Sequence, residues 1–148
     1  MFKHILIPTD GSALSMKAVK SGMALAKEAG AKVTVLKVIE PSCVLATDSK
    51  RVAATRQAYE RQVRDLAERE LHDADVSARK QGVDCTTMLQ RHAQPYQAII
   101  DTATKKRCDL IAMASHGRKG VRALILGSET NKVLTHSRIP VLVYRFKT

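Results

Sequence analysis

A loop in the last third of the chain has the residue types of an anion-binding site. Gly117 and Gly127 enclose nine residues, and Ser128 stands where a helical pattern begins. Glycines let main-chain N–H groups approach a ligand without an intervening Cβ, and a helix N-terminus offers unpaired donors and a favourable dipole. This combination suits a phosphate group. Ser128 is expected either to cap the helix or to donate its hydroxyl group to a phosphate oxygen, and a cap after an ordinary loop is the alternative without a ligand.

Other polar residues near the sheet ends add candidate contacts. Asp10 lies in the turn 8–12 and is a candidate ligand for a ribose, or for Mg²⁺ carried by a nucleotide. An aspartate at this point can equally form a turn by itself. Arg118 could balance phosphate charge or belong to a solvated loop tip. His116 could contact a phosphate or have a structural role.

Signatures of familiar catalytic sites are absent from the sequence. It has no Gly-x4-Gly-Lys-Ser/Thr loop, no Gly-x-Gly-x-x-Gly after the first apolar run and no nucleophile elbow. The five histidines and three scattered cysteines show no metal-ligand spacing. Because no side chain stands out as a base for activating water, any hydrolysis of ATP is expected to be slow or incidental.

These candidates must be held by a fold in which strands and helices alternate. The expected strands are 5–7, 32–39, 83–90, 110–114 and 140–144, and the expected helices are 13–29, 49–81, 95–106 and 128–135. This alternation predicts an α/β fold: a single doubly wound open sheet of five mainly parallel strands with helices on both faces, Rossmann-like in architecture. In such a sheet ligands bind beyond the carboxyl ends of the strands, where strand order reverses. That rule selects the loops 8–12 and 115–128.

The composition fits one globular domain over residues 1–148. Hydrophobic residues make up 45% and charged residues 26% of the chain, outside the range of disordered chains. The short apolar run at the N-terminus is no secretory or membrane segment, so a cytoplasmic location without membrane contact is expected. The formal net charge of +11 favours anionic partners without choosing among them. Nucleic acid is an unlikely partner, because the charges are not interleaved with aromatic residues.

Four separated blocks carry a resemblance to a known family. They are Ile7-Pro8-Thr9-Asp10-Gly11-Ser12, Val35-Leu36-Lys37-Val38-Ile39, the segments 109–118 and 126–128, and Pro140-Val141-Leu142-Val143. The blocks occur in the order typical of the universal stress protein family and together extend over essentially the whole chain. In these blocks the sequence resembles that family. The resemblance implies a five-stranded open sheet, a homodimer and, in the nucleotide-binding branch, ATP held by a Gly-x2-Gly-x9-Gly-Ser/Thr motif. This chain departs from the motif at its first glycine, where Ala114 stands.

The resemblance also implies roles for individual residues. The implied nucleotide-binding residues are Pro8, Thr9 and Asp10 on the adenosine side, Val38 through its main chain at adenine, Met113 and Ala114 at the sugar, and Gly117, Gly127, Ser128 and the N–H of Glu129 at the phosphates, with His116 and Arg118 beside them. The Glu129 carboxylate would repel a nearby phosphate, so it is expected to point away.

The implied function is that of a stress-response protein that binds ATP, ADP or AMP and acts as a dimeric regulatory module toward an unknown protein partner. The last strand, about 139–146, is the expected dimer edge, because an open edge strand needs protection. Two alternatives stay open. One is a weak ATPase or phosphotransferase at the same site, if a metal and Asp10 position a water. The other is a nucleotide-free signalling or scaffold protein, which Ala114 and Glu129 favour.

Overall fold

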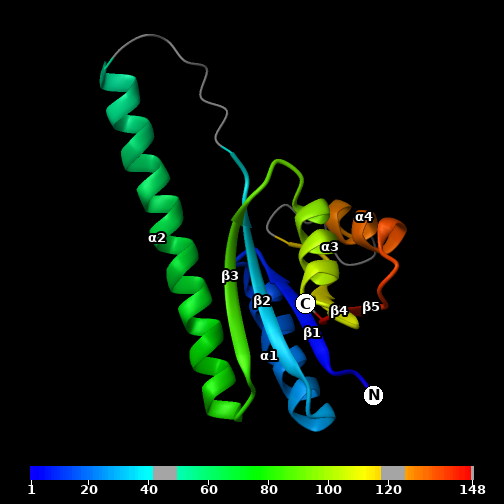
Figure 1. Cartoon of the computed structure of the whole chain (residues 1–148). Helices are drawn as coiled ribbons and strands as arrows, with labels where there is room; N and C mark the ends of the chain where they lie inside the picture. The colour runs from blue at the N-terminus through cyan, green and yellow to red at the C-terminus, as the bar shows by residue number, and fades with distance from the viewer. Residues whose placement is uncertain (42–49, 118–125, 148) are drawn as a thin grey trace.

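Strands and helices alternate along the whole described chain. The computed structural model describes residues 1–41, 50–117 and 126–147, with residues 50–53 as backbone only. The elements are β1 (His4–Thr9), α1 (Ala13–Ala29), β2 (Lys32–Ile39), α2 (Lys50–Gln81), β3 (Cys85–Arg91), α3 (Pro95–Lys105), β4 (Leu110–Ala114), α4 (Ser128–His136) and β5 (Val141–Tyr144) (Figure 1). The five strands form one sheet in the order β3-β2-β1-β4-β5, and every neighbouring pair is parallel. The predicted doubly wound α/β fold is confirmed.

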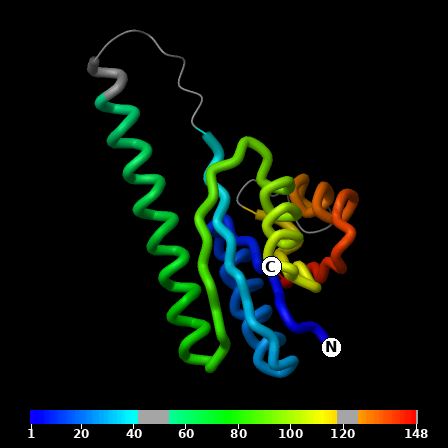
Figure 2. The backbone as a smooth tube through the Cα atoms, in the orientation of Figure 1, coloured from blue at the N-terminus to red at the C-terminus, as the bar shows by residue number. Residues whose placement is uncertain are grey.

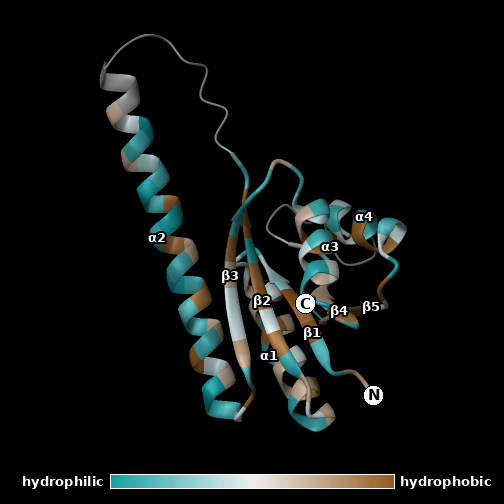
Figure 3. Ribbon diagram, in the orientation of Figure 1, coloured by the Kyte–Doolittle hydropathy of each residue, from teal (hydrophilic) through white to brown (hydrophobic). Residues whose placement is uncertain are grey.

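Two helices cover each face of this sheet. α1 and α2 pack on one face, over a core that includes Ile5, Ile7 and Val35. α3 and α4 pack on the other face, over Leu6 and Ile111. Both faces of the central strands are buried, which explains why their sequences are apolar almost throughout. Figure 3 shows the contrast between hydrophobic stretches along β1 and β2 and the largely hydrophilic surface of α2.

The bounds differ most from the expected ones at the end of β1, which reaches Thr9 instead of Ile7, and at the start of β3. The sequence predicted a strand from Val83, whereas β3 begins at Cys85. Gly82 adopts a left-handed φ of 70°, and the Val83 N–H donates to the Ala78 carbonyl oxygen at 2.9 Å. Val83 therefore closes the end of α2 instead of opening the strand.

Helix α2 is longer than the strands beside it. Its 32 residues span roughly 48 Å, whereas the 8 residues of β2 span roughly 26 Å. The helix runs beside β3 and continues past the carboxyl ends of the strands toward its own N-terminus (Figure 2). Its expected first residue, Ser49, lies outside the described residues. Glu70 and Leu71 are buried, so the C-terminal half of α2 is the part that packs on the sheet.

Strands β1 and β4 lie at the point where strand order reverses. The register pairs between them end at Leu6 and Ile111. Pro8 lies two residues further along β1, beyond that pairing, where its missing N–H interrupts no ladder between the two strands. Pro8 and Thr9, which the sequence placed in a turn, therefore belong to β1. The reversal coincides with the sheet edge that carries residues 10–12 and 115–117.

Candidate functional site

A pocket of about 370 Å³ opens at this edge, within the range of ~300–1,000 Å³ that is common for small-ligand sites. Every predicted site residue that the structure describes lines it: Pro8, Thr9, Asp10, Val38, Met113, Ala114, His116, Gly117, Gly127, Ser128 and Glu129. The remaining one, Arg118, lies outside the described residues. The fold thus brings together residues of β1, β2, β4 and α4 that are distant in the sequence.

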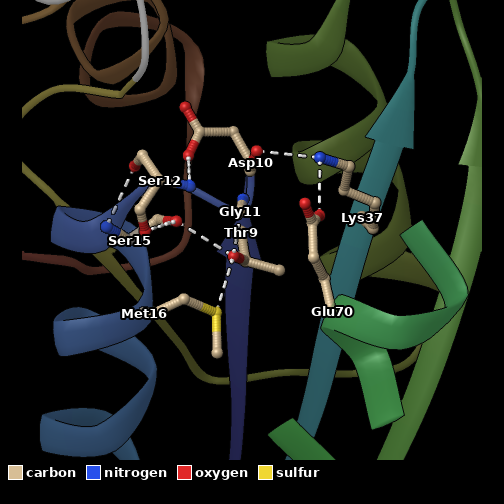
Figure 4. Close-up of polar contacts among 8 residues, drawn as sticks. All are labelled: Thr9, Asp10, Gly11, Ser12, Ser15, Met16, Lys37 and Glu70. Carbon is tan, nitrogen blue, oxygen red and sulfur yellow. Dashed lines mark hydrogen bonds and ion pairs between the residues drawn. The ribbon is translucent and has the colours of Figure 1, made fainter. Parts of the chain in front are cut away.

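The turn after β1 is held by its own side chains (Figure 4). The Ser12 N–H donates to Asp10 Oδ1 at 2.9 Å, and the Gly11 N–H donates to Thr9 Oγ1 at 3.1 Å. Ser12 also caps α1, because its Oγ accepts the Ser15 N–H at 3.2 Å. Asp10 therefore has the turn-forming role that the sequence offered as an alternative, and the buried Thr9 uses its hydroxyl group within the turn.

The Asp10 carboxylate also faces the loop after β4. A Cβ added at Gly117 would collide with Asp10 Oδ2, so the carboxylate occupies the space that a side chain at this position would need. A glycine at position 117 therefore lets the loop after β4 contact the turn after β1, whether or not its main chain also approaches a ligand. A carboxylate at this point accepts hydrogen bonds from hydroxyl groups and can bind Mg²⁺, whereas it repels a bare phosphate.

The N-terminus of α4 presents main-chain donors to the pocket. Gly127 is the N-cap residue and Ser128 is the first helical residue, so the capping role expected for Ser128 is wrong. The first helical hydrogen bond joins the Asn131 N–H to the Gly127 carbonyl oxygen at 3.0 Å. The N–H groups of Ser128, Glu129 and Thr130 precede it and have no carbonyl acceptor in their own helix. An anion could accept hydrogen bonds from these three amides.

Gly127 closes the loop on the end of β4. Its N–H donates to the Ser115 carbonyl oxygen at 2.8 Å. A Cβ at position 127 would lie 3.0 Å from the His116 Cα, so the two segments approach this closely only because residue 127 is a glycine. His116 Nδ1 lies 3.1 Å from Ser115 Oγ. The Gly127 amide, expected at a phosphate, is thus already used within the protein.

The Glu129 carboxylate is directed to the start of α3. Its Oε2 accepts the Tyr96 N–H at 2.8 Å, and its Oε1 lies 3.4 Å from Lys132 Nζ. The N-cap residue of α3, Gln94, makes no side-chain cap hydrogen bond, so Glu129 satisfies a donor that would otherwise lack one. These contacts agree with the expectation that the carboxylate points away from the donors of its own helix.

The main chain of Val38 faces the pocket side of β2. In a parallel strand, successive residues direct their N–H and C=O groups alternately to the two neighbouring strands. The Ile39 carbonyl oxygen accepts the His92 N–H on the β3 side at 2.9 Å. The Val38 groups therefore point to the β1 side, one residue beyond the last register pair with β1, Thr9–Lys37.

The end of β4 is tied to the first turn of α4. Met113 and Ala114, which line the pocket, are largely buried. The Ala114 carbonyl oxygen accepts the Thr130 hydroxyl group at 3.0 Å, and Thr130 is itself buried. This bond fixes the distance between the strand and the helix donors.

Some residues that line the pocket were not predicted from the sequence. Lys37, Pro95 and Ile99 also line the pocket. Lys37 is a charged residue between the apolar residues Leu36 and Val38 of β2, and a charge at that point was the sequence signal that could have identified it. Pro95 and Ile99 come from α3, whose place over the pocket depends on packing that sequence spacing does not fix.

The described side chains form no cluster with the make-up of a metal site. Among residues 1–41, 50–117 and 126–147, no three His, Cys, Asp or Glu side chains gather closely enough to hold a metal ion. Burial raises the pKa of both Cys85 and Cys108 to about 11, so their thiols stay protonated at neutral pH. Within the same residues, no helix combines the length and the apolar character that crossing a membrane requires.

Comparisons with known proteins agree with this architecture. The profile of the universal stress protein family matches residues 1–145. Universal stress protein YxiE of Bacillus subtilis is 30% identical over 149 residues, covering 98% of this chain and 100% of that protein. The solved structure of MJ0577, a universal stress protein of Methanocaldococcus jannaschii, has a TM-score of 0.82 at 26% identity, covering 100% of this chain and 99% of the other.

Two other solved structures of this fold hold adenine nucleotides. A universal stress protein in complex with cAMP has a TM-score of 0.72 at 22% identity, and covers 99% of each chain. The universal stress protein of Archaeoglobus fulgidus in complex with dAMP has a TM-score of 0.63 at 18% identity, and covers 98% of each chain. Their likeness to this chain concerns the fold alone. With a profile match over nearly its whole length and relatives at 30% identity, this chain belongs to the universal stress protein family.

Proposed function

We propose that this chain binds an adenine nucleotide in the pocket at the carboxyl edge of the sheet and acts as a cytoplasmic, dimeric regulatory module. The observation that carries the proposal is the presence in one pocket of two sets of main-chain groups, those of Val38 and the amides that begin α4. Proteins of the same fold were solved with cAMP and dAMP, which supports the choice of an adenine nucleotide.

The Val38 groups suit the base. An N–H and a C=O on the same side of one residue match an edge of adenine, which offers a ring-nitrogen acceptor beside the N6 amino donor. Ile99 and Met113 supply apolar lining for the flat base and the sugar. Asp10 would accept from the ribose hydroxyl groups.

The start of α4 suits the phosphate. The amides of Ser128, Glu129 and Thr130 would donate to phosphate oxygens, with the helix dipole favouring the charge. The acidic residues Asp10 and Glu40 also line the pocket. A longer phosphate chain would therefore need positive charge beside it. Arg118, or Mg²⁺ bound to the phosphates near Asp10, could supply that charge.

The regulatory part of the proposal concerns assembly. β5 is the edge strand beside β4, and Leu142 on it is 37% exposed. Pairing of this edge with a second copy would protect it and would join two pockets in one particle. Nucleotide occupancy would then alter the contacts of the dimer with a protein partner.

The proposal is tested by deleting one amide from the helix start. Ser128→Pro removes an N–H at the first helical position, where proline is favoured, and Gly127 before it already has the extended ψ of 154° that proline requires. AMP binding measured by calorimetry is expected to weaken roughly tenfold, the effect of one hydrogen bond to a charged group, while adenosine binding stays unchanged. Ser128→Ala keeps the amide and serves as the matched control.

Two results would count against the proposal. An equal loss of adenosine and AMP affinity in Ser128→Pro would show that the amide does not meet the phosphate. No response of the unaltered protein to millimolar AMP, ADP, ATP or cAMP, and no nucleotide released from purified protein on denaturation, would favour the nucleotide-free alternative. Ala114→Gly then shows whether the missing motif glycine is the reason, because it would restore binding.

A further inference from the structure

A buried ion pair joins α2 to the turn that carries Asp10. Lys37 Nζ lies 2.9 Å from Glu70 Oε2, and their side chains are only 12% and 11% exposed. The Lys37 ammonium also donates to the Asp10 carbonyl oxygen at 2.8 Å. Figure 4 shows Lys37 of β2 reaching between the carboxylate of Glu70 and the turn after β1. Removing one partner of such a pair would leave the other charge buried without compensation, so the two side chains depend on each other.

The same carboxylate packs against the turn on its other side. Gly11 has a left-handed φ of 80°, and a Cβ added there would collide with the carboxylate of Glu70. The turn is therefore held at two successive residues, Asp10 through Lys37 and Gly11 through Glu70. The next contact in the series is the Asp10 carboxylate against Gly117 on the loop after β4.

We infer that Glu70 and Lys37 are positioning residues for the pocket: they fix the turn after β1 so that the Asp10 carboxylate stands against Gly117, and they thereby couple the packing of α2 to ligand affinity. Neither acts on a ligand directly in this role. The effect on affinity rests on the proposed nucleotide binding, whereas the ordering of the turn does not. Because affinity and packing are linked, a bound nucleotide must in return stabilise this part of α2.

The inference is tested first without any ligand, by hydrogen exchange of the turn amides. The N–H groups of Gly11 and Ser12 donate within the turn, so their protection reports its order. Glu70→Gln and Lys37→Met are expected to raise exchange at both amides roughly tenfold, because local opening becomes easier when the anchoring pair is lost. Lys37→Arg, which keeps the charge and its donors, is expected to retain most of the protection.

Two control variants separate positioning from general effects. Glu68→Gln removes the carboxylate of an exposed pair with Arg64 on the same helix, and should leave the turn as it is. Cys108→Ala removes a buried group on the other face of the sheet, where α3 and α4 pack, and should not raise exchange at Gly11 and Ser12 selectively. Glu70→Asp, which keeps the charge and withdraws it by one methylene, gives an intermediate result and serves if Glu70→Gln does not fold.

The second arm measures AMP affinity by calorimetry. Glu70→Gln is expected to bind AMP roughly tenfold more weakly than the Glu68→Gln and Cys108→Ala controls do. Unchanged exchange at Gly11 and Ser12 in Glu70→Gln, Glu70→Asp and Lys37→Met would overturn the inference. If the unaltered protein binds no nucleotide while these variants loosen the turn, the proposed function fails and the positioning role stands.

Discussion

Two glycines, one in the turn after β1 and one in the loop after β4, stand next to carboxylates that fill the space where their side chains would be. Glu70 lies against Gly11, and Asp10 lies against Gly117. The sequence motif explains a glycine at position 117 by the close approach of a phosphate. The structure gives a second reason, which is the contact of Gly117 with the turn after β1. A replacement at this position therefore acts on the protein even without a ligand.

Gly117→Ala is expected to lower the free energy of unfolding by roughly 1–3 kcal/mol, because the new methyl group must displace the Asp10 carboxylate. Urea denaturation measures this cost. In the double variant Asp10→Ala with Gly117→Ala the clash is absent, so the second substitution should cost much less than it does alone. Additive costs of the two substitutions would show that the carboxylate is not the cause.

His4 makes folding stability depend on pH. Its Nδ1 lies 3.1 Å from the Lys106 carbonyl oxygen, so Nδ1 carries the proton, and Nε2 accepts from the Thr34 hydroxyl group at 2.8 Å. Burial and the nearby Lys32 lower the pKa of His4, and they outweigh the Lys106 carbonyl and Asp109, which raise it. The neutral ring is thus favoured in the folded state.

A lowered pKa in the folded state means that the unfolded chain binds the proton more readily. The contribution of His4 to stability is therefore present above its ordinary pKa and is lost as the pH falls through that value toward the folded one. Urea denaturation at neutral and mildly acidic pH should show this loss in the unaltered protein and in the exposed-site control His72→Gln. The loss should be smaller in His4→Gln, and an identical pH dependence in all three proteins would contradict the assignment.

At the scale of elements, two buried threonines in α3 and α4 offer a matched comparison. Thr130 donates its hydroxyl group to the Ala114 carbonyl oxygen, whereas the buried Thr102 hydroxyl group has no hydrogen-bond partner among the described residues. Thr130→Val should cost about 1–2 kcal/mol of unfolding free energy, because it leaves a buried carbonyl unpaired. Thr102→Val should be neutral or stabilising, because it removes a buried polar atom without a partner. Equal effects in urea denaturation would refute the distinction.

The elements themselves were largely predictable from the sequence, and the reasons are local. Gly30 and Gly82 end helices in left-handed conformations, and the apolar runs of β2 and β4 have the lengths of buried strands. Val83 was misplaced because an apolar residue after a glycine can close a helix as well as open a strand. The glycine-bracketed loop placed the candidate site at the edge of the sheet where the pocket lies. The pairing of Lys37 with Glu70 was not predictable, because it joins two elements whose contact no local sequence pattern indicates.

At the scale of the whole molecule, the sheet has an open edge at β5. The ring centroids of Tyr144 and Phe146 are 6.0 Å apart, and Leu142 on β5 is 37% exposed. If this edge pairs with a second copy, light scattering after size exclusion should show a dimer at micromolar concentration. Leu142→Lys should shift the protein toward monomer, since a charge at a paired edge is unfavourable.

The control for this prediction lies on α2. Leu66 is 41% exposed on that helix, away from the edge strand, and Leu66→Lys should leave the dimer intact. A monomeric unaltered protein, or equal dissociation in both variants, would contradict assembly through β5.

The order of the strands also has a consequence for the growing chain. β1 is made first yet lies at the centre of the sheet, and its partner β4 follows about a hundred residues later. During synthesis the residues of β1 and β2 that line the pocket are therefore made long before the amides at the start of α4. If the proposed nucleotide binding holds, a nucleotide that needs both would stabilise only chains in which α4 has been made, so its cellular concentration would bear on the survival of newly made protein.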